Sequence, residues 1–361
     1  MKTLAEAQAQ LGRFGFDSAQ HAVFRERAAQ ATASNAVTSE LSPLRPGTIE
    51  VMPPLGSLER EKLRVEGLAL IRAGQVGIVV LAGGMATRFG GVVKAVVPAL
   101  DDRSFLEWKV ADARAIADEA GGHVPVLVMS SFATHAVIEQ HVAAKALGHV
   151  DIFPQAVDLR LTPTGELFTD KDGELSPYAT GHGDLPAALR ASGALDRFRK
   201  RGGTTLLMSN VDNLAATLDP AVIALHVQLG GALTAEVVKK DPGDKGGAPA
   251  LYDGRPQIIE GFRFPASFDQ DSIDVFNTNT FTLDAATLDR AFELPYYRVE
   301  KQVHGAPAIQ FEHLVGELTA YVPSRFIQVS RVGAESRFLP AKDPDELERN
   351  RPAIAAVLGR R

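Results

Sequence analysis

The segment VGIVVLAGGMATRFGG at residues 76–91 limits the possible folds of this chain more than any other feature. Its first part, residues 76–82, is an unbroken apolar run, which is typical of a strand buried on both faces of a parallel sheet. The run stops at Gly83 and Gly84. Glycine has no side chain, so a ligand can come close to the backbone, and the backbone N–H groups there can bind phosphate. The segment therefore predicts a buried strand followed by a ligand-binding loop.

The residues after the two glycines favour an anionic ligand. Arg88 carries a planar fork of donors and Lys94 a point charge, and both suit phosphate oxygens. The glycine spacing is neither G-x-G-x-x-G nor G-x-x-x-x-G-K-[ST], so neither the dinucleotide fingerprint nor the P-loop is predicted. An ordinary tight turn between a strand and a helix is the alternative interpretation.

Charge balance and cysteine content exclude several classes of function. With 38 Lys and Arg against 44 Asp and Glu, the chain has a formal net charge of −6 and lacks the basic surplus of a nucleic-acid-binding protein. It contains no cysteine, which excludes disulfides, thiolate metal sites and cysteine nucleophiles. The N-terminus shows no secretory pattern and no apolar run is long enough to span a membrane. We therefore expect a cytoplasmic protein.

The pattern of apolar runs predicts an α/β fold. Strands are expected at 76–81, 124–129, 152–153 and 204–208, with helices at 104–120 and 134–147 between them. This alternation predicts a parallel sheet with helices on both faces and a ligand at the carboxyl ends of its strands. From Gly231 onward we expect an antiparallel meander that forms the far wall of the pocket.

The domain organisation follows from the same texture. Residues 1–75 are predicted to be a helical N-terminal extension, with a proline-rich linker at 42–54. Residues 76–345 are predicted to form the α/β domain, and residues 346–361 a C-terminal helix.

A second glycine-rich motif, YATGHGD, ends at Asp184 directly before a predicted helix. Glycines at the start of a helix form a site for flat or anionic ligands, here with Gly181 and His182 in the loop. Asp184 is expected to cap the helix, with Pro186 in its first turn. The alternative is a capped loop in which His182 is a surface residue.

A third motif, SNVDN, follows the predicted strand at 204–208 and places Asn210 and Asp212 at its carboxyl end. A carboxylate at this point is well placed to hold Mg²⁺ between phosphates, since Mg²⁺ prefers hard oxygen ligands. The alternative is that Asp212 caps the next helix, for which Asp219 before Pro220 is the better candidate.

Weaker signals complete the set. The carboxylate of Glu260 and the amides of Asn277 and Asn279 suit sugar hydroxyls, although asparagine-rich segments are more often turns. Gly247 lies in a basic glycine turn. Arg337 and Lys342 are two cations that flank an apolar turn, and the alternative for them is a solvated cationic surface.

Taken together, the motifs resemble one known family. They occur in the order LAGGMATRFG, ATGHGD, SNVDNL, KGGAPAL with QIIEGFRFP, FNTNTF and RFLPAK. This order is similar to that of the UDP-glucose pyrophosphorylase family, which comprises UTP–glucose-1-phosphate uridylyltransferases and their UDP-N-acetylhexosamine relatives. The resemblance covers roughly residues 76–345. It implies a GT-A-like, Rossmann-type mixed sheet and the reaction of UTP with a sugar 1-phosphate to give UDP-sugar and pyrophosphate.

The resemblance also implies roles for individual residues. Gly83, Gly84, Thr87 and Arg88 would lie in the nucleotide loop, and Lys94 and Lys342 would bind phosphates. Gln155 resembles the family's uracil-reading glutamine, with Gly181 near the base. His182 would lie close to the sugar phosphate and Asp212 would bind Mg²⁺. The sugar would be lined by Asn210, Gly247, Glu260 and Asn279.

The implied chemistry needs no side-chain nucleophile, because positioning, Mg²⁺ and cations supply the acceleration. The expected partners are small molecules, with no nucleic acid polymer and no membrane. Eukaryotic members carry a left-handed β-helix after this core, for which the residues after Lys342 leave no room. Because that module often governs association in the family, the resemblance implies nothing about the oligomeric state of this chain.

Three alternatives remain at this point. The acceptor could be N-acetylglucosamine 1-phosphate or another hexose phosphate. The chain could be a non-catalytic nucleotide-sugar-binding protein, an interpretation that Ala86 in place of the family's glycine and the Val92-Val93-Lys94 context favour. Asp212 and Lys342 argue against it. A glycosyltransferase is disfavoured because no D-x-D motif ends a strand.

Overall fold

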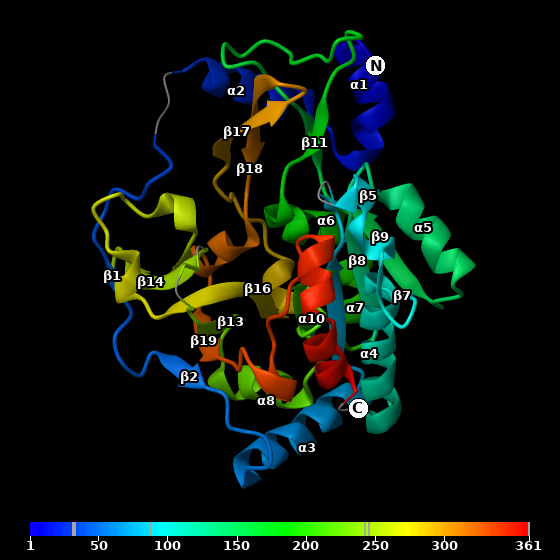
Figure 1. The fold of residues 1–361 in the computed structure, drawn as a ribbon, viewed down its shortest axis with the longest axis vertical. Coiled ribbons are helices and arrows are strands. Elements are labelled where there is room, and N and C mark those ends of the chain that lie inside the picture. The colour runs from blue at the N-terminus through cyan, green and yellow to red at the C-terminus, as the bar shows by residue number, and fades with distance from the viewer. Residues whose placement is uncertain (31–33, 87–88, 242, 245, 360–361) are drawn as a thin grey trace.

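A mixed sheet forms the centre of the molecule (Figure 1). The computed structural model describes residues 1–30, 34–86, 89–241, 243–244 and 246–359. Within them, an eight-stranded sheet has the order β2-β19-β13-β16-β12-β3-β8-β9. Its strands are β2 (Ile49–Val51), β3 (Val76–Leu81), β8 (Val126–Ser130), β9 (Val150–Pro154), β12 (Thr205–Asn210), β13 (Leu233–Lys239), β16 (Val275–Asp284) and β19 (Ser324–Gln328). Strands β12, β3, β8 and β9 pair in parallel, whereas β16 is antiparallel to both its neighbours.

Helices cover both faces of this sheet, which confirms the predicted α/β class (Figure 1). Successive residues of β3 point to opposite faces. Ile78 and Val80 join the core under α3, α4, α5, α8 and α10, while Val79 and Leu81 join the core under α6, α7 and α9. The helices are α3 (Leu58–Arg72), α4 (Phe105–Ala120), α5 (His135–Ala144), α6 (Leu185–Ala191), α7 (Ala194–Lys200), α8 (Pro220–Leu229), α9 (Ala285–Leu288) and α10 (Pro344–Leu358).

Local sequence signals explain where the principal helices begin and end. Helix α4 starts at a capping box formed by Ser104 and Glu107 and stops at Gly121, whose φ of 67° is left-handed. Helix α8 is capped by Asp219, as the sequence predicts. Helix α3 packs against α8 at Gly67, where a Cβ atom would lie 1.8 Å from the carbonyl oxygen of Pro220.

The N-terminal stretch packs against small hairpins outside the main sheet and also adds a strand to the main sheet. Helices α1 (Leu4–Leu11) and α2 (Ser18–Ala29) pack against two hairpins. These are β10 (Val157–Leu159) with β11 (Pro177–Ala179), and β17 (Tyr297–Val303) with β18 (Ala306–Glu312). The expectation of a linker at 42–54 was wrong, because β1 (Leu41–Pro43) pairs with β14 (Ala248–Tyr252) and β2 pairs with β19. Buried Met52 and partly buried Ile49 explain why this proline-rich stretch adheres to the core. The domain boundaries at residues 75 and 345 stay predictions.

From Gly231 onward, the expected antiparallel pairing is present, but part of it belongs to the main sheet. Strands β13 and β16 extend the main sheet, and β13 pairs in parallel with β19. Only the remaining strands form antiparallel hairpins outside it. These are β14 (Ala248–Tyr252) with β15 (Arg255–Ile259), and β17 (Tyr297–Val303) with β18 (Ala306–Glu312).

Short strands complete the described structure. They are β4 (Met85–Ala86), β5 (Val92–Val93), β6 (Pro98–Leu100), β7 (Arg103–Ser104), β10 (Val157–Leu159) and β11 (Pro177–Ala179). Through the described ranges, none of the helices is both long enough and apolar enough to cross a membrane.

Candidate functional site

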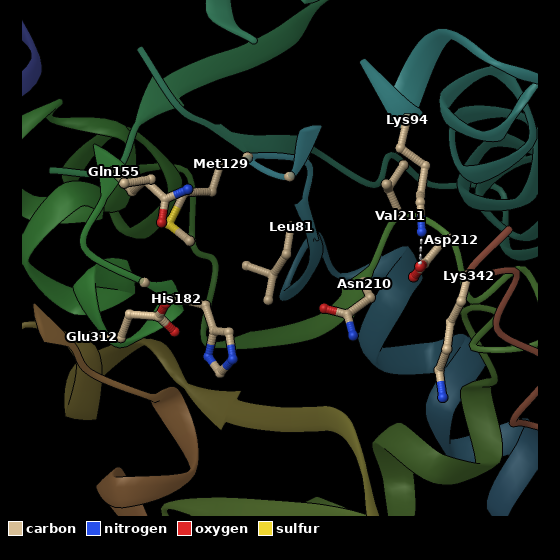
Figure 2. A pocket seen from close by; sticks show the side chains of 14 residues that line it. Leu81, Lys94, Met129, Gln155, His182, Asn210, Val211, Asp212, Glu312 and Lys342 are labelled. Atoms are coloured by element: carbon tan, nitrogen blue, oxygen red, sulfur yellow. Dashed lines mark hydrogen bonds and ion pairs between the residues drawn. The ribbon is translucent and has the colours of Figure 1, made fainter. Parts of the chain in front are cut away.

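A cavity of about 560 Å³ opens where β3 and β12 end, on the side of their carboxyl termini (Figure 2). Its volume lies within the range of small-molecule sites, which runs from about 300 to 1,000 Å³. The predicted residues that line it are Gly83, Gly84, Lys94, Gln155, Gly181, His182, Asn210, Asp212 and Lys342. Sequence reasoning did not single out its other lining residues, which are Leu81, Met129, Ala179, Val211 and Glu312.

One end of the cavity, here called the charged end, consists of Lys94, Asp212 and Lys342. Lys94 Nζ donates to Asp212 Oδ2 at 2.7 Å and to the carbonyl oxygen of Ala341 at 3.0 Å. The side chain of Lys342 starts beside Asp212 and extends away from this pair (Figure 2). Two cations and one carboxylate therefore line this end of the cavity, an arrangement suited to a phosphate chain with a divalent cation.

Residue Asn213 joins the two loops that form the charged end. Its Oδ1 accepts from the N–H of Leu339 at 2.9 Å, and its Nδ2 donates to the carbonyl oxygen of Arg337 at 3.0 Å. The N–H of Ala341 donates to the carbonyl oxygen of Asp212 at 3.2 Å. These bonds place Lys342, which is far away in sequence, next to Asp212.

Arg337 does not belong to a solvated cationic surface, the alternative that the sequence left open. Its guanidinium is buried, and its Nη2 donates to Glu236 Oε1 at 2.6 Å. It also donates to the carbonyl oxygen of Thr217 at 3.1 Å. Arg337 therefore anchors the loop that carries Lys342 and does not face the cavity.

Lys109, on α4, holds the loop that follows β12 and carries Asp212, and it was missed by sequence reasoning. Its side chain is 3% exposed, and desolvation lowers the pKa of its ammonium to about 8. Its Nζ donates to Ser209 Oγ at 3.0 Å and to the carbonyl oxygens of Asn213 at 2.7 Å and Ala216 at 2.8 Å. The available signal was a lysine on the apolar face of a predicted helix, between Leu106 and Val110.

The opposite end, here called the glutamine end, is formed by Gly83, Gln155 and Gly181. A Cβ atom on Gly83 would lie 1.9 Å from Gln155 Nε2, whereas one on Gly84 would meet nothing within 4 Å. Gly83 is therefore required because the buried glutamine packs directly against it. The amide of Gln155 points into the cavity (Figure 2).

The glycine loop after β11 is held by Asp184 and His313. Asp184 was expected to cap α6, but no capping bond forms. Its Oδ2 instead accepts from the N–H of Ala156 at 3.0 Å and from Thr180 Oγ1 at 2.5 Å, while its Oδ1 pairs with His313 Nε2 at 2.6 Å. Gly181 has a φ of 109°, and a Cβ atom there would lie 2.4 Å from the carbonyl oxygen of His313.

His182 faces the cavity as a neutral ring and is not a surface residue. Desolvation and, to a smaller extent, nearby His313 lower the pKa of His182 to about 4. Its Nδ1 accepts from the N–H of Val315 at 3.0 Å. The proton of the neutral ring must therefore be on Nε2, which makes this atom a donor.

The residues predicted to line the sugar lie beside Asn210 and extend beyond the cavity. Asn279 Nδ2 donates to Asn210 Oδ1 at 3.1 Å. Asn279 has a φ of 56°, an unusual conformation within a strand that its N–H stabilises by donating to Asn277 Oδ1 at 3.0 Å. Of the four, only Asn210 lines the cavity, whereas Asn279, Gly247 and Glu260 do not.

Gly247 and Glu260 nevertheless continue the same wall. The carbonyl oxygen of Gly247 accepts from the N–H of Asn277 at 2.8 Å, and a Cβ atom on Gly247 would lie 3.0 Å from Glu260 Oε2. Desolvation, with a contribution from Glu317, raises the pKa of Glu260 to about 7. Thr87 and Arg88, predicted for the nucleotide loop, lie outside the described residues.

The donor set at the charged end fits a magnesium ion that arrives with its substrate. Among the residues that the structure describes, no three His, Cys, Asp or Glu side chains gather into a metal cage. Mg²⁺ commonly binds through one or two carboxylates plus substrate phosphates and water, and does not need such a cage. Asp212 supplies one carboxylate at the cavity, so it fits this mode.

Comparison with known proteins gives a consistent family match. The family model described as UTP–glucose-1-phosphate uridylyltransferase matches residues 18–350. The curated protein of that description from Musa acuminata is 29% identical over 317 residues, which are 82% of this chain and 64% of the relative. The one from Saccharomyces cerevisiae is 27% identical over 297 residues, 76% of this chain and 58% of the relative. The chain thus matches about 60% of the length of such relatives.

Solved structures show the same fold. The UDP-N-acetylglucosamine pyrophosphorylase of Trypanosoma brucei, in complex with an inhibitor, superposes with a TM-score of 0.77 and 18% identity, covering 96% of this chain and 79% of that one. A variant of the UDP-glucose pyrophosphorylase of Leishmania major gives a TM-score of 0.74 and 22% identity, covering 91% and 73%. At these identities the likeness concerns the fold alone.

Proposed function

Because the chain belongs to the UTP–glucose-1-phosphate uridylyltransferase family, we propose that it transfers the uridylyl group of UTP to a sugar 1-phosphate, foremost glucose 1-phosphate. The observation that supports this proposal most strongly is the polarity of the cavity. Lys94, Asp212 and Lys342 meet at one end, and the amide of Gln155 points in at the other (Figure 2). A nucleotide has the same polarity, with a neutral base at one end and a phosphate chain at the other.

The reaction is a displacement at phosphorus. A phosphate oxygen of the sugar 1-phosphate attacks the α-phosphorus of UTP, the bond to the bridging oxygen breaks, and pyrophosphate leaves with the electron pair. Lys94 and Lys342 donate to the phosphate oxygens and neutralise the charge that develops there. Because both reactants are anions, most of the acceleration must come from holding them in line and from this neutralisation.

Asp212 would hold Mg²⁺, which when bound supplies a further positive charge to the triphosphate. The bond between Lys94 Nζ and Asp212 Oδ2 would then be replaced, since both groups have a better partner in the bound state. Lys94 would turn from the carboxylate to a phosphate oxygen. The ion pair therefore keeps the two groups close to their working positions before substrate arrives.

The remaining residues would orient the neutral parts of the substrates. The Gln155 amide would hydrogen-bond uracil beside Gly181, and the loop with Gly83, Gly84, Thr87 and Arg88 would pass along the nucleotide. His182 Nε2 would donate to an oxygen near the sugar phosphate, since its Nδ1 is already used by Val315. Asn210, Asn279, Gly247 and Glu260 would line the sugar.

The proposed partners are therefore UTP and a sugar 1-phosphate, with neither a nucleic acid nor a membrane required. The absence of cysteine from all 361 residues is compatible with the reducing environment of the cytoplasm, which stays our prediction for its location.

A substrate panel tests the proposal. Pyrophosphate release is measured with UTP and Mg²⁺ and, in turn, the 1-phosphates of glucose, galactose, N-acetylglucosamine and N-acetylgalactosamine, and each reaction is repeated with ATP, CTP and GTP. We expect turnover with UTP and glucose 1-phosphate. A preference for N-acetylglucosamine 1-phosphate would identify that compound, and not glucose 1-phosphate, as the acceptor. UDP-sugar binding without any turnover would instead identify a binding protein and contradict the proposed reaction.

A further inference from the structure

Glu312 is an acidic side chain in the cavity with no role in the reaction described above. It is the last residue of β18, and its side chain enters the cavity on the side of Gln155 and His182 (Figure 2). The backbone of the next residue, His313, packs directly on Gly181. Glu312 therefore lies at the glutamine end, whereas Asp212 lies at the charged end.

The carboxylate of Glu312 is held in place by its neighbours. Gln310 Nε2 donates to Glu312 Oε1, and Gln310 Oε1 in turn accepts from Arg160 Nε at 3.0 Å. Lys301 Nζ lies 3.8 Å from the same Oε1 atom. In the described part of the chain, no residue donates to Oε2. One carboxylate oxygen is thus fixed by the protein and the other is free for a ligand.

A carboxylate has a narrow choice of partners in a cavity that accepts polyanions. It only accepts hydrogen bonds when ionised, and it repels phosphate. At the glutamine end it can face only the base or the ribose of a nucleotide. Uracil has a single ring N–H, and the amide oxygen of Gln155 can accept its hydrogen bond. Ribose, by contrast, has two hydroxyl donors. A carboxylate is also the group that binds ribose hydroxyls in dinucleotide sites.

We propose that Glu312 accepts a hydrogen bond from the ribose diol of the nucleotide and thereby selects ribonucleotides over deoxyribonucleotides. This inference rests on the proposed function, because it requires a uridine nucleotide with its base at Gln155. Glu312 is then a specificity residue that contacts substrate away from the reacting phosphorus. A site that has a fixed charged acceptor for a hydroxyl rejects analogues without that hydroxyl, since the acceptor is left unpaired.

Equilibrium binding of UTP, 2′-deoxy-UTP and 3′-deoxy-UTP in the presence of Mg²⁺ tests the proposal by calorimetry. We expect the unaltered protein to bind UTP about 10- to 100-fold more tightly than at least one deoxy analogue, as for a hydrogen bond to a charged group. Glu312→Ala should lower the affinity for UTP by a similar factor and leave the affinity for that deoxy analogue nearly unchanged. Glu312→Gln, which keeps the shape with a weaker acceptor, should lie between them.

Glu300→Gln is the matched control, because it removes an exposed carboxylate from the same hairpin and should leave all three affinities unchanged. Equal weakening of all three nucleotides by Glu312→Ala would indicate a structural role and overturn the proposal, as would an unchanged ratio of UTP to both analogues. Binding of UTP with this discrimination but without turnover would contradict the proposed reaction and leave Glu312 in its role. Failure to bind any uridine nucleotide would overturn both.

Discussion

The two ends of the cavity are built by different physical means. At the charged end, Lys94 and Asp212 are paired with each other, so a ligand must replace a protein–protein bond. At the glutamine end, Gln155 is fixed by direct packing on Gly83, and its amide is neutral, so a ligand does not have to open an ion pair to reach it. We therefore propose different roles for the two ends. The charged end would rearrange and carry the chemistry, whereas the preformed glutamine end would recognise the nucleotide.

Removing the charge of Asp212 should have the largest effect, because it affects the end that we propose carries the chemistry. Asp212→Asn keeps the side-chain shape but loses the charge that pairs with Lys94 and would hold Mg²⁺. We expect kcat to fall by about 10²- to 10³-fold, as for the loss of one electrostatic contact to a transition state. Steady-state pyrophosphate release measures this. Asp345→Asn, at an exposed position of α10, is the control, and full activity of the Asp212 variant would refute the assignment.

Breaking the connection between the two loops of the charged end should have the next largest effect. Asn213→Ala removes one buried and one partly buried hydrogen bond to the segment 337–339 and leaves their backbone partners unsatisfied. We expect a loss of about 1–3 kcal/mol in the free energy of unfolding, measured in urea. Because Lys342 depends on the same segment, kcat should fall as well. A stable variant with unchanged kcat would show that the anchor does not position Lys342.

The glutamine end can be perturbed with a matched pair of glycines. Gly83→Ala places a Cβ atom 1.9 Å from Gln155 Nε2 and must displace the amide, whereas the Cβ atom of Gly84→Ala meets nothing within 4 Å. For Gly83→Ala we expect KM for UTP to rise about three- to tenfold, the value of one neutral hydrogen bond, with little change in kcat. Equal KM values for the two variants would argue against direct packing as the basis of recognition.

The last expected effect, on stability and not on activity, is the pH dependence caused by His182, which lies on the side of the glutamine end. Its pKa is lowered from an ordinary 6.5 to about 4. Between these values the unfolded chain binds a proton at this ring that the folded chain does not, so the free energy of unfolding falls as the pH decreases through that window. Urea midpoints from pH 7 to pH 5 should therefore fall more steeply in the unaltered protein than in His182→Asn. Parallel curves would mean that the ring is not desolvated.

The sequence predicts this site well where its signals are local. The apolar run before Gly83 and the strand before Asp212 place both residues at strand ends of a parallel sheet, and the structure brings them to one cavity. It predicts poorly what depends on distant partners. Asp184 precedes a helix and matches a cap, yet it bonds to Ala156 and His313, and no local pattern contains those contacts.

Buried charged residues are also predicted poorly from the sequence, because their partners are distant. Arg337 and Lys109 are charged residues in segments that a sequence pattern assigns to surface or to an apolar helix face, and each is stabilised by partners about a hundred residues away. Glu312 ends an alternating strand, and only the packing of His313 on Gly181 brings it to the cavity. The short strand β2 escaped prediction because its three residues carry too little pattern to outweigh the neighbouring prolines.

The structure of the protein in complex with UDP-glucose tests the central claim, the polarity of the cavity, most directly. We predict that uracil lies against Gln155 and Gly83, and that the diphosphate lies between Lys94 and Lys342. The Lys94–Asp212 pair should be opened in the complex with UTP and Mg²⁺, while Gln155 keeps its position. A nucleotide bound in the opposite direction, or one bound outside this cavity, would contradict the account.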